Sequence, residues 1–110
     1  MRFDSLAEFE KELKRLSKKY RSLPDDLEEF KKVISVIPLG TSKHFNVLHS
    51  VGNVKVVKAR LFCRYLKGTS LRVIYSYDGA KIEFVFIELY FKGDKENEDR
   101  ERIKKYLKGL

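Results

Sequence analysis

The middle of this 110-residue chain lacks acidic side chains, since no Asp or Glu occurs between Glu29 and Asp78. The same window holds nine Lys and Arg residues, and the formal net charge of the whole chain is +8. The residues outside this window therefore carry a net charge of −1, so the excess positive charge of the chain lies within the window. Protein surfaces usually mix both signs of charge, because a field of one sign repels itself. The concentrated positive charge predicts a polyanionic partner, with nucleic acid as the first candidate.

The chain also has few residues that bind metals, namely one cysteine, Cys63, and two histidines, His44 and His49. A single cysteine excludes an internal disulfide and is typical of a reducing compartment. Three such ligands at these spacings are too few for a structural zinc site, so we expect neither a metal nor a cofactor. We expect Cys63 to be a buried, inert thiol and both histidines to be surface residues of a loop.

Long apolar runs are absent, and none approaches the roughly 20 residues that a membrane helix needs. The N-terminal segment, which begins Met1-Arg2-Phe3-Asp4, does not have the pattern of a secretory signal. With 43% apolar residues and only two prolines, the chain can form a core, and its length is typical of one domain over residues 1–110. We therefore expect a single-domain cytoplasmic protein that does not contact a membrane.

Apolar side chains at three- and four-residue steps predict two N-terminal helices. The first is expected from Ser5 to about Tyr20, with Ser5 and Glu8 forming a capping box. The second begins after Ser22, where a proline and two acids suit a first helical turn, and ends before Gly40. Because the turn between the helices is short, we expect an antiparallel helical hairpin.

After a polar loop predicted from Gly40 to Asn53, the apolar side chains change to a period of two. Three antiparallel strands are expected, at residues 56–64, 71–77 and 82–91. The strongest hairpin signal is Asp78-Gly79, and a last helix follows with Asn97 as its N-cap. The predicted fold is α+β, with the helical hairpin packed on a small antiparallel meander and a C-terminal helix. A short additional strand at residues 2–3 is compatible with this pattern.

Basic side chains alternate with apolar ones along the first predicted strand. We expect four cations on one face of the sheet: Lys58, Arg60, Arg64 and, from the next strand, Arg72. Neighbours on one face of a strand lie roughly 6.5–7 Å apart, close to the spacing of phosphates along a single nucleic-acid strand. Phe62 and Tyr90 add aromatic rings near these cations. Basic side chains interleaved with aromatic ones are typical of surfaces that bind single-stranded RNA.

A row of Lys and Arg also occurs on the solvated side of many antiparallel sheets. A solvated face normally places opposite charges on neighbouring strands, and this chain supplies no acid for that purpose before Asp78. The absence favours a binding surface. Glu88 on the third strand has two interpretations, a general base or, as we expect, an ion-pair partner of Arg72.

Several short stretches also occur in an order and spacing that are similar to those of a known family. They are Lys18-Lys19-Tyr20, Asp25-Asp26-Leu27, Pro38-Leu39-Gly40, Val57-Lys58-Ala59-Arg60-Leu61, Leu71-Arg72-Val73-Ile74-Tyr75 and Tyr90-Phe91-Lys92-Gly93-Asp94-Lys95. Over nearly its whole length the chain resembles the RelE-like mRNA interferases of the RelE/ParE superfamily of type II toxins. The resemblance implies a ribosome-dependent endoribonuclease. Such an enzyme inhibits translation by cutting mRNA through attack of a ribose 2′-hydroxyl on the adjacent phosphate.

The resemblance implies roles for individual residues. Lys58 and Arg60 match the family's basic strand, and Arg72 matches its transition-state arginine. Tyr90 is the nearest group for proton transfer. Further RNA contacts are expected from Lys55, Phe62, Arg64, Lys67, Lys92 and Lys95.

The implied partners are an acidic antitoxin, the ribosome and mRNA, with a homodimer or a hetero-oligomer with the antitoxin as the assembly. Two other functions stay open, because fold and activity are separable. One is a ParE-like gyrase inhibitor that shares the fold without the nuclease. The other is a module that binds RNA or protein without cleaving anything.

Overall fold

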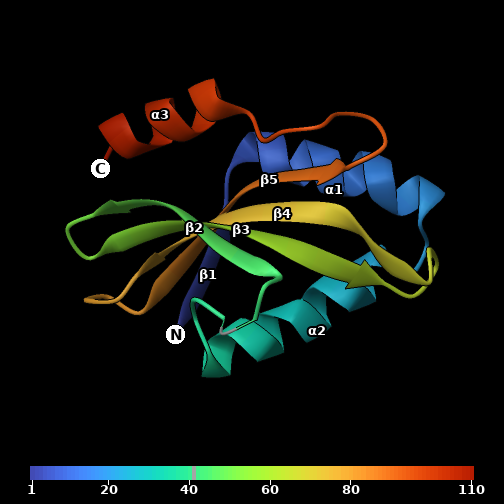
Figure 1. Cartoon of the computed structure of the whole chain (residues 1–110), viewed down its shortest axis with the longest axis horizontal. Helices are drawn as coiled ribbons and strands as arrows, with labels where there is room; N and C mark the ends of the chain where they lie inside the picture. The colour runs from blue at the N-terminus through green and yellow to red at the C-terminus, as the bar shows by residue number, and fades with distance from the viewer. Residues whose placement is uncertain (41) are drawn as a thin grey trace.

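A computed structural model describes residues 1–40 and 42–110 of the chain (Figure 1). In this part of the chain the elements follow in the order β1 (Arg2–Ser5), α1 (Ala7–Lys19), α2 (Leu23–Val36), β2 (Phe45–Val51), β3 (Val54–Cys63), β4 (Gly68–Asp78), β5 (Glu83–Phe91) and α3 (Arg100–Lys108). The strands form a sheet of order β1-β5-β4-β3-β2. The α+β class, the meander β3–β5 and the C-terminal helix agree with the sequence prediction.

Two strands lie outside the predicted meander and make the sheet mixed. β1 confirms the short N-terminal strand, but it pairs parallel with β5, so the sheet is not purely antiparallel. β2 occupies half of the predicted loop from Gly40 to Asn53, so the loop assignment was wrong for these seven residues. Its side chains are mostly exposed and a bulge after Val47 breaks the alternation, which removes the apolar period from the sequence. Thr41, in the same predicted loop, lies outside the described residues.

The helices α1 and α2 cover one face of the sheet and run in roughly opposite directions (Figure 1). Their apolar side chains form the main core with those of β3, β4 and β5. Phe9 of α1 stacks on Phe86 at 5.2 Å between ring centroids, and Phe30 of α2 meets the edge of Tyr75 at 5.7 Å. Each fully buried side chain of this size contributes about 1.5–3 kcal/mol, so this face dominates the stability of the fold.

The helix starts differ in detail from the sequence prediction. Ser5 belongs to β1 and its hydroxyl donates to Glu10 at 2.8 Å, while α1 has no side-chain cap, so the capping box was wrong. Asp99, not Asn97, caps α3, because its carboxylate accepts from the backbone N–H of Arg102 at 3.0 Å. Both errors come from placing the helix start by residue type in stretches with several candidate caps.

The third helix lies on the opposite face and covers only part of it (Figure 1). A small second core forms there from Val56, Ile74, Ile87, Tyr90 and Ile103. The edge of β5 beyond β1 is covered by two charged side chains. Glu12 of α1 accepts from the backbone N–H of Leu89 at 3.1 Å, and Arg102 of α3 donates to the carbonyl of Ile87 at 3.0 Å. Arg102 and Glu12 also form an ion pair at 2.9 Å, which ties α3 to α1 across this edge.

None of the helices within residues 1–40 and 42–110 is long and apolar enough to cross a membrane.

Candidate functional site

A polar pocket of about 510 Å³ lies on the face that α3 leaves partly uncovered. We call it the basic pocket, and its charged or titratable lining residues are Lys43, His44, Lys58, Arg60, Arg72, Lys92 and Glu96. Lys58 and Arg60 extend from β3 and Arg72 from β4, while the other four belong to the segments before β2 and after β5. The structure therefore brings together four of the residues that the sequence analysis singled out: Lys58, Arg60, Arg72 and Lys92.

Arg60 and Arg72 lie directly opposite each other on neighbouring strands, and Tyr90 lies opposite Arg72 on β5. Like charges placed opposite one another destabilise a sheet. Among the described residues no carboxylate lies within ion-pair distance of either arginine. Two facing arginines without a carboxylate lower the stability of the fold, but they are suited to bind an anion that bridges the two guanidinium groups.

Arg72 is only 7% exposed. Its guanidinium donates to the backbone carbonyls of Thr69 and Leu71, which fixes the side chain without neutralising it. Burial and, after it, the charge of Arg60 lower the pKa of Arg72. A buried cation that meets another cation instead of a carboxylate is the strongest electrostatic sign of a ligand site in this structure.

Lys58 holds a carboxylate from the segment that leads to α3. Its ammonium donates to Glu98 at 2.9 Å, and both side chains are largely buried. Burial opposes a charged lysine, but the hydrogen bond to Glu98 and the nearness of Tyr90 outweigh it, so the pKa of Lys58 is raised. Burial likewise opposes a charged Glu98, yet Lys58 holds the pKa of Glu98 below its ordinary value. The pair stays charged over the physiological range.

Tyr90 neighbours Arg72 on β5 but does not line the basic pocket, and it is 4% exposed. Its hydroxyl has no hydrogen-bond partner among the described residues, and the ammonium of Lys95 lies 5.1 Å from its ring centroid. Burial raises the pKa of Tyr90, although Lys58 acts against the shift. The phenol is therefore neutral at physiological pH and can donate a proton or a hydrogen bond, but it is no base.

Glu88 does not pair with Arg72, so that expectation was wrong. Its carboxylate is fully buried, contacts the ammonium of Lys95, and accepts from the backbone N–H of Asp99 at 2.7 Å. The segment after β5 folds back to bring both groups to Glu88, a path that the sequence pattern does not reveal. Lys95 is thereby engaged in a structural contact.

The remaining predicted RNA-binding residues lie elsewhere. Lys55 is on the opposite face of β3 from Lys58, and its ammonium donates to Ser50 at 2.7 Å. Arg64 does not share a face with Lys58 and Arg60, because β3 ends at Cys63 and Arg64 lies in the turn that follows, where the alternation of a strand no longer applies. It instead pairs with Asp26 at 3.2 Å and Asp25 at 3.6 Å.

Lys67 lies in the β3–β4 turn with a positive φ of 51° and does not line the basic pocket. Cys63 is fully buried, as expected. His49 lies exposed on β2. Three charged or titratable residues of the basic pocket had no predicted site role: Lys43, His44 and Glu96. A histidine in a predicted loop carries no periodic signal, and only the pairing of β2 with β3 places His44 beside Arg60.

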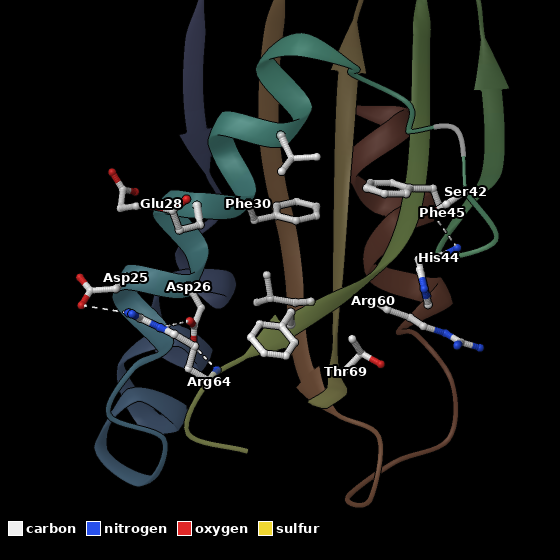
Figure 2. Close-up of a pocket in the computed structure, with 14 residues that line it drawn as sticks. Asp25, Asp26, Glu28, Phe30, Ser42, His44, Phe45, Arg60, Arg64 and Thr69 are labelled. Carbon is white, nitrogen blue, oxygen red and sulfur yellow. Dashed lines mark hydrogen bonds and ion pairs between the residues drawn. The ribbon is translucent and has the colours of Figure 1, made fainter. Parts of the chain in front are cut away.

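A second hollow adjoins the basic pocket, between α2 and β3 (Figure 2). We call it the apolar groove; it has a volume of about 670 Å³, and its apolar lining is Phe30, Val33, Phe45, Leu61 and Phe62. Carboxylates of α2 lie along one side, and His44 and Arg60 line both hollows. Figure 2 shows Arg64 turned toward Asp25 and Asp26 on the α2 side, and Arg60 turned away from them beside His44. Among the described residues no group of three or more His, Cys, Asp or Glu side chains could hold a metal ion.

Fold and site together define a small α+β protein that carries a basic pocket on the partly open face of its sheet. No family model and no curated protein sequence matches the chain. Among solved structures it is similar to a chain of the archaeal RelE–RelB complex from Pyrococcus horikoshii OT3. The TM-score is 0.64 at 22% sequence identity, over 86% of this chain and 97% of that one. The chain therefore has a RelE-like fold.

Proposed function

We propose that this protein is the toxin of a type II toxin–antitoxin system and acts as a ribosome-dependent mRNA endonuclease in the cytoplasm. The observation that carries the proposal is the pair of facing arginines, Arg60 and Arg72, of which the second is buried without a carboxylate partner. The RelE-like fold supports the same function, since the similar solved structure is a RelE–RelB complex.

In the proposed reaction a ribose 2′-hydroxyl attacks the adjacent phosphate, and negative charge builds on the phosphorane oxygens. Arg72 and Arg60 face the same pocket and stabilise that charge, with Lys58 completing the cationic side. Because Arg72 is already fixed by two backbone carbonyls, it needs little rearrangement when RNA binds. Tyr90, the neighbour of Arg72 on β5, acts as a neutral hydrogen-bond donor, and Lys92 at the rim of the pocket contacts a phosphate.

The proposed partner is an acidic antitoxin that covers the basic pocket and neutralises it. Such a segment blocks RNA by occupying the same cations, and charge complementarity gives it fast and specific association. The apolar groove beside the pocket provides the surface against which we expect the antitoxin's apolar side chains to pack. The other proposed partners are the ribosome and the mRNA exposed on it.

Arg72→Ala tests the proposal in a purified translation system in which the 5′ ends of the mRNA are mapped. Wild-type protein is expected to produce cuts within codons on ribosomes. The variant is expected to cut about 10²- to 10³-fold more slowly, because removal of one preorganised donor to a developing oxyanion has an effect of this size. Arg72→Lys, which keeps the charge but loses the planar fork, should restore only part of the activity.

Circular dichroism and thermal unfolding of both variants separate a lost function from a lost fold. A folded Arg72→Ala protein that cuts like the wild type contradicts the role of Arg72.

A second function, RNA binding without cleavage, is favoured by one observation. Two of the groups assigned to the reaction are engaged or covered, since Lys58 is paired with Glu98 and Tyr90 is buried. Intact mRNA with stalled ribosomes in the same experiment supports this alternative. Intact mRNA with normal translation supports the gyrase inhibitor or a protein-binding module.

A further inference from the structure

The proposed cleavage needs a group that accepts the proton of the attacking 2′-hydroxyl, and most groups of the basic pocket cannot do so. Lysine and arginine side chains are charged at neutral pH. Tyr90 keeps its proton because burial raises its pKa, and Glu98 is held by Lys58. Glu88 is fully buried against Lys95 and Asp99. The remaining candidates in the pocket lining are the imidazole of His44 and the carboxylate of Glu96.

His44 is fixed at the junction of the two hollows by its backbone. Its carbonyl accepts from the N–H of Arg60 at 3.0 Å, and its own N–H donates to the hydroxyl of Ser42 at 3.1 Å. The first bond holds the segment before β2 against β3, and the second lies within that segment. Figure 2 shows the imidazole beside the side chain of Arg60, at the rim that the apolar groove shares with the basic pocket.

The imidazole of His44 has an unused nitrogen. Its Nδ1 atom is buried and has no hydrogen-bond partner among the described residues. Buried polar atoms in folded proteins are normally paired, and the exceptions call for an explanation such as a catalytic role or an absent ligand. A histidine used only for structure would be expected to bond a neighbouring carbonyl or carboxylate through this atom.

We propose that His44 is the general base of the cleavage reaction, an inference that rests on the proposed function. The imidazole takes the proton from the 2′-hydroxyl while the 2′-oxygen forms a bond to the adjacent phosphorus. The bond from phosphorus to the 5′-oxygen breaks, and this oxygen leaves with a proton from solvent. The products are a 2′,3′-cyclic phosphate and a 5′-hydroxyl, and the imidazolium returns its proton to solvent. Arg60, whose backbone N–H donates to the carbonyl of His44, contacts the phosphate that the 2′-oxygen attacks.

Imidazole is the one side chain whose ordinary pKa lies near neutrality, so a base of this type is active at physiological pH. Charged groups face His44 from both hollows. The basic pocket presents Lys43, Lys58, Arg60, Arg72, Lys92 and Glu96. The apolar groove presents Asp25, Asp26, Glu28, Glu29 and Arg64.

The test compares His44→Ala with wild type in single-turnover cleavage of mRNA on ribosomes between pH 6 and 9. We expect the cleavage rate to fall by about 10²- to 10⁴-fold, the range for loss of a general base. The wild-type rate should rise with pH and then level off, and His44→Ala should lose the plateau. Added imidazole should restore part of the variant's rate. Affinity for RNA with a 2′-deoxy nucleotide at the cleavage position should be unchanged, because the base acts after binding.

His49→Ala is the matched control, because His49 is exposed on β2 and does not line the basic pocket. Its rate and pH profile should equal those of the wild type. If His44→Ala cuts with the wild-type rate and pH profile, the inference is overturned while the proposed function stands. If Glu96→Gln, and not His44→Ala, removes the plateau, the base is Glu96 and the inference is likewise overturned. Absence of cleavage by wild-type protein overturns both the inference and the proposed function.

Discussion

The two faces of the sheet are built from alternate residues of the same strands and have opposite characters. On β4, Val73 and Tyr75 point into the core under α1 and α2, whereas Arg72 points to the other side with Ile74. The helix-covered face is apolar and aromatic. The other face has a small apolar core under α3 and, beside it, cations that repel one another. The first face explains why the chain folds, and the second contains charge that folding does not need.

The largest expected effect tests the helix-covered face. Phe86→Ala removes a side chain that is 2% exposed and stacks with both Phe9 and Phe3. We expect the free energy of unfolding to fall by about 3–5 kcal/mol, which combines the lost transfer free energy and the cavity left behind. Chemical denaturation followed by circular dichroism measures it.

Val85→Ala is the control for this prediction, because Val85 is the adjacent residue on the other side of the strand and is only half-buried. If Phe86→Ala lowers the free energy of unfolding no more than Val85→Ala does, the helix-covered face is not the main source of stability, and the two faces do not differ in this respect.

The helix-covered face was the more predictable of the two. Its helices and the strands β3 and β4 follow from apolar periods of 3.6 and 2 residues, and β5 follows from a nearly continuous apolar run, all of which local sequence carries directly. β2 was missed because its side chains are mostly exposed and a bulge interrupts it. A period of two in apolar residues arises because one face of a strand is buried. A strand such as β2, which buries few side chains, therefore shows no such period in the sequence.

The open face could be predicted only where side chains alternate regularly between the two sides of a strand. This alternation correctly places Lys58 and Arg60 on one face, and the hairpin places Arg72 on the same face. It fails for Arg64, because β3 ends one residue earlier, at Cys63, and Arg64 belongs to the turn that follows. The contacts of Lys58 with Glu98 and of Glu88 with Lys95 depend on the path of the segment after β5. These contacts decide which cations are free, and neither composition nor spacing specifies them.

A smaller effect, which depends on pH, tests the ion pair that holds the segment before α3 to the open face of the sheet. Glu98→Gln removes the charged partner of Lys58, and hydrogen bonds to charged groups contribute about 1.5–3 kcal/mol, so we expect a loss in this range at pH 7. Because the pKa of Glu98 is lowered in the folded protein, its stabilisation is complete above its ordinary value of 4.5 and is lost as the pH falls through the lower folded value. Because the pKa of Lys58 is raised, its share is complete below 10.5 and is lost as the pH rises through the higher folded value.

The measurement is the free energy of unfolding of wild type and Glu98→Gln across this range. The difference between the two proteins should be largest near neutrality and shrink at both ends. A difference that stays constant with pH would show that the ion pair is not its source.

The smallest expected effect separates two arginines that are four residues apart. Arg60 faces the basic pocket, whereas Arg64, in the turn after β3, pairs with Asp25 and Asp26 on the α2 side. If Arg60 contacts a phosphate, Arg60→Ala should reduce the slope of log affinity against log salt for a non-cleavable RNA by about 0.7, the value for one phosphate of a single strand. Arg64→Ala should leave that slope unchanged, because its charge is already compensated by carboxylates. Equal slopes for the two variants would mean that RNA responds only to net charge, and the distinction between the faces would then have no bearing on binding.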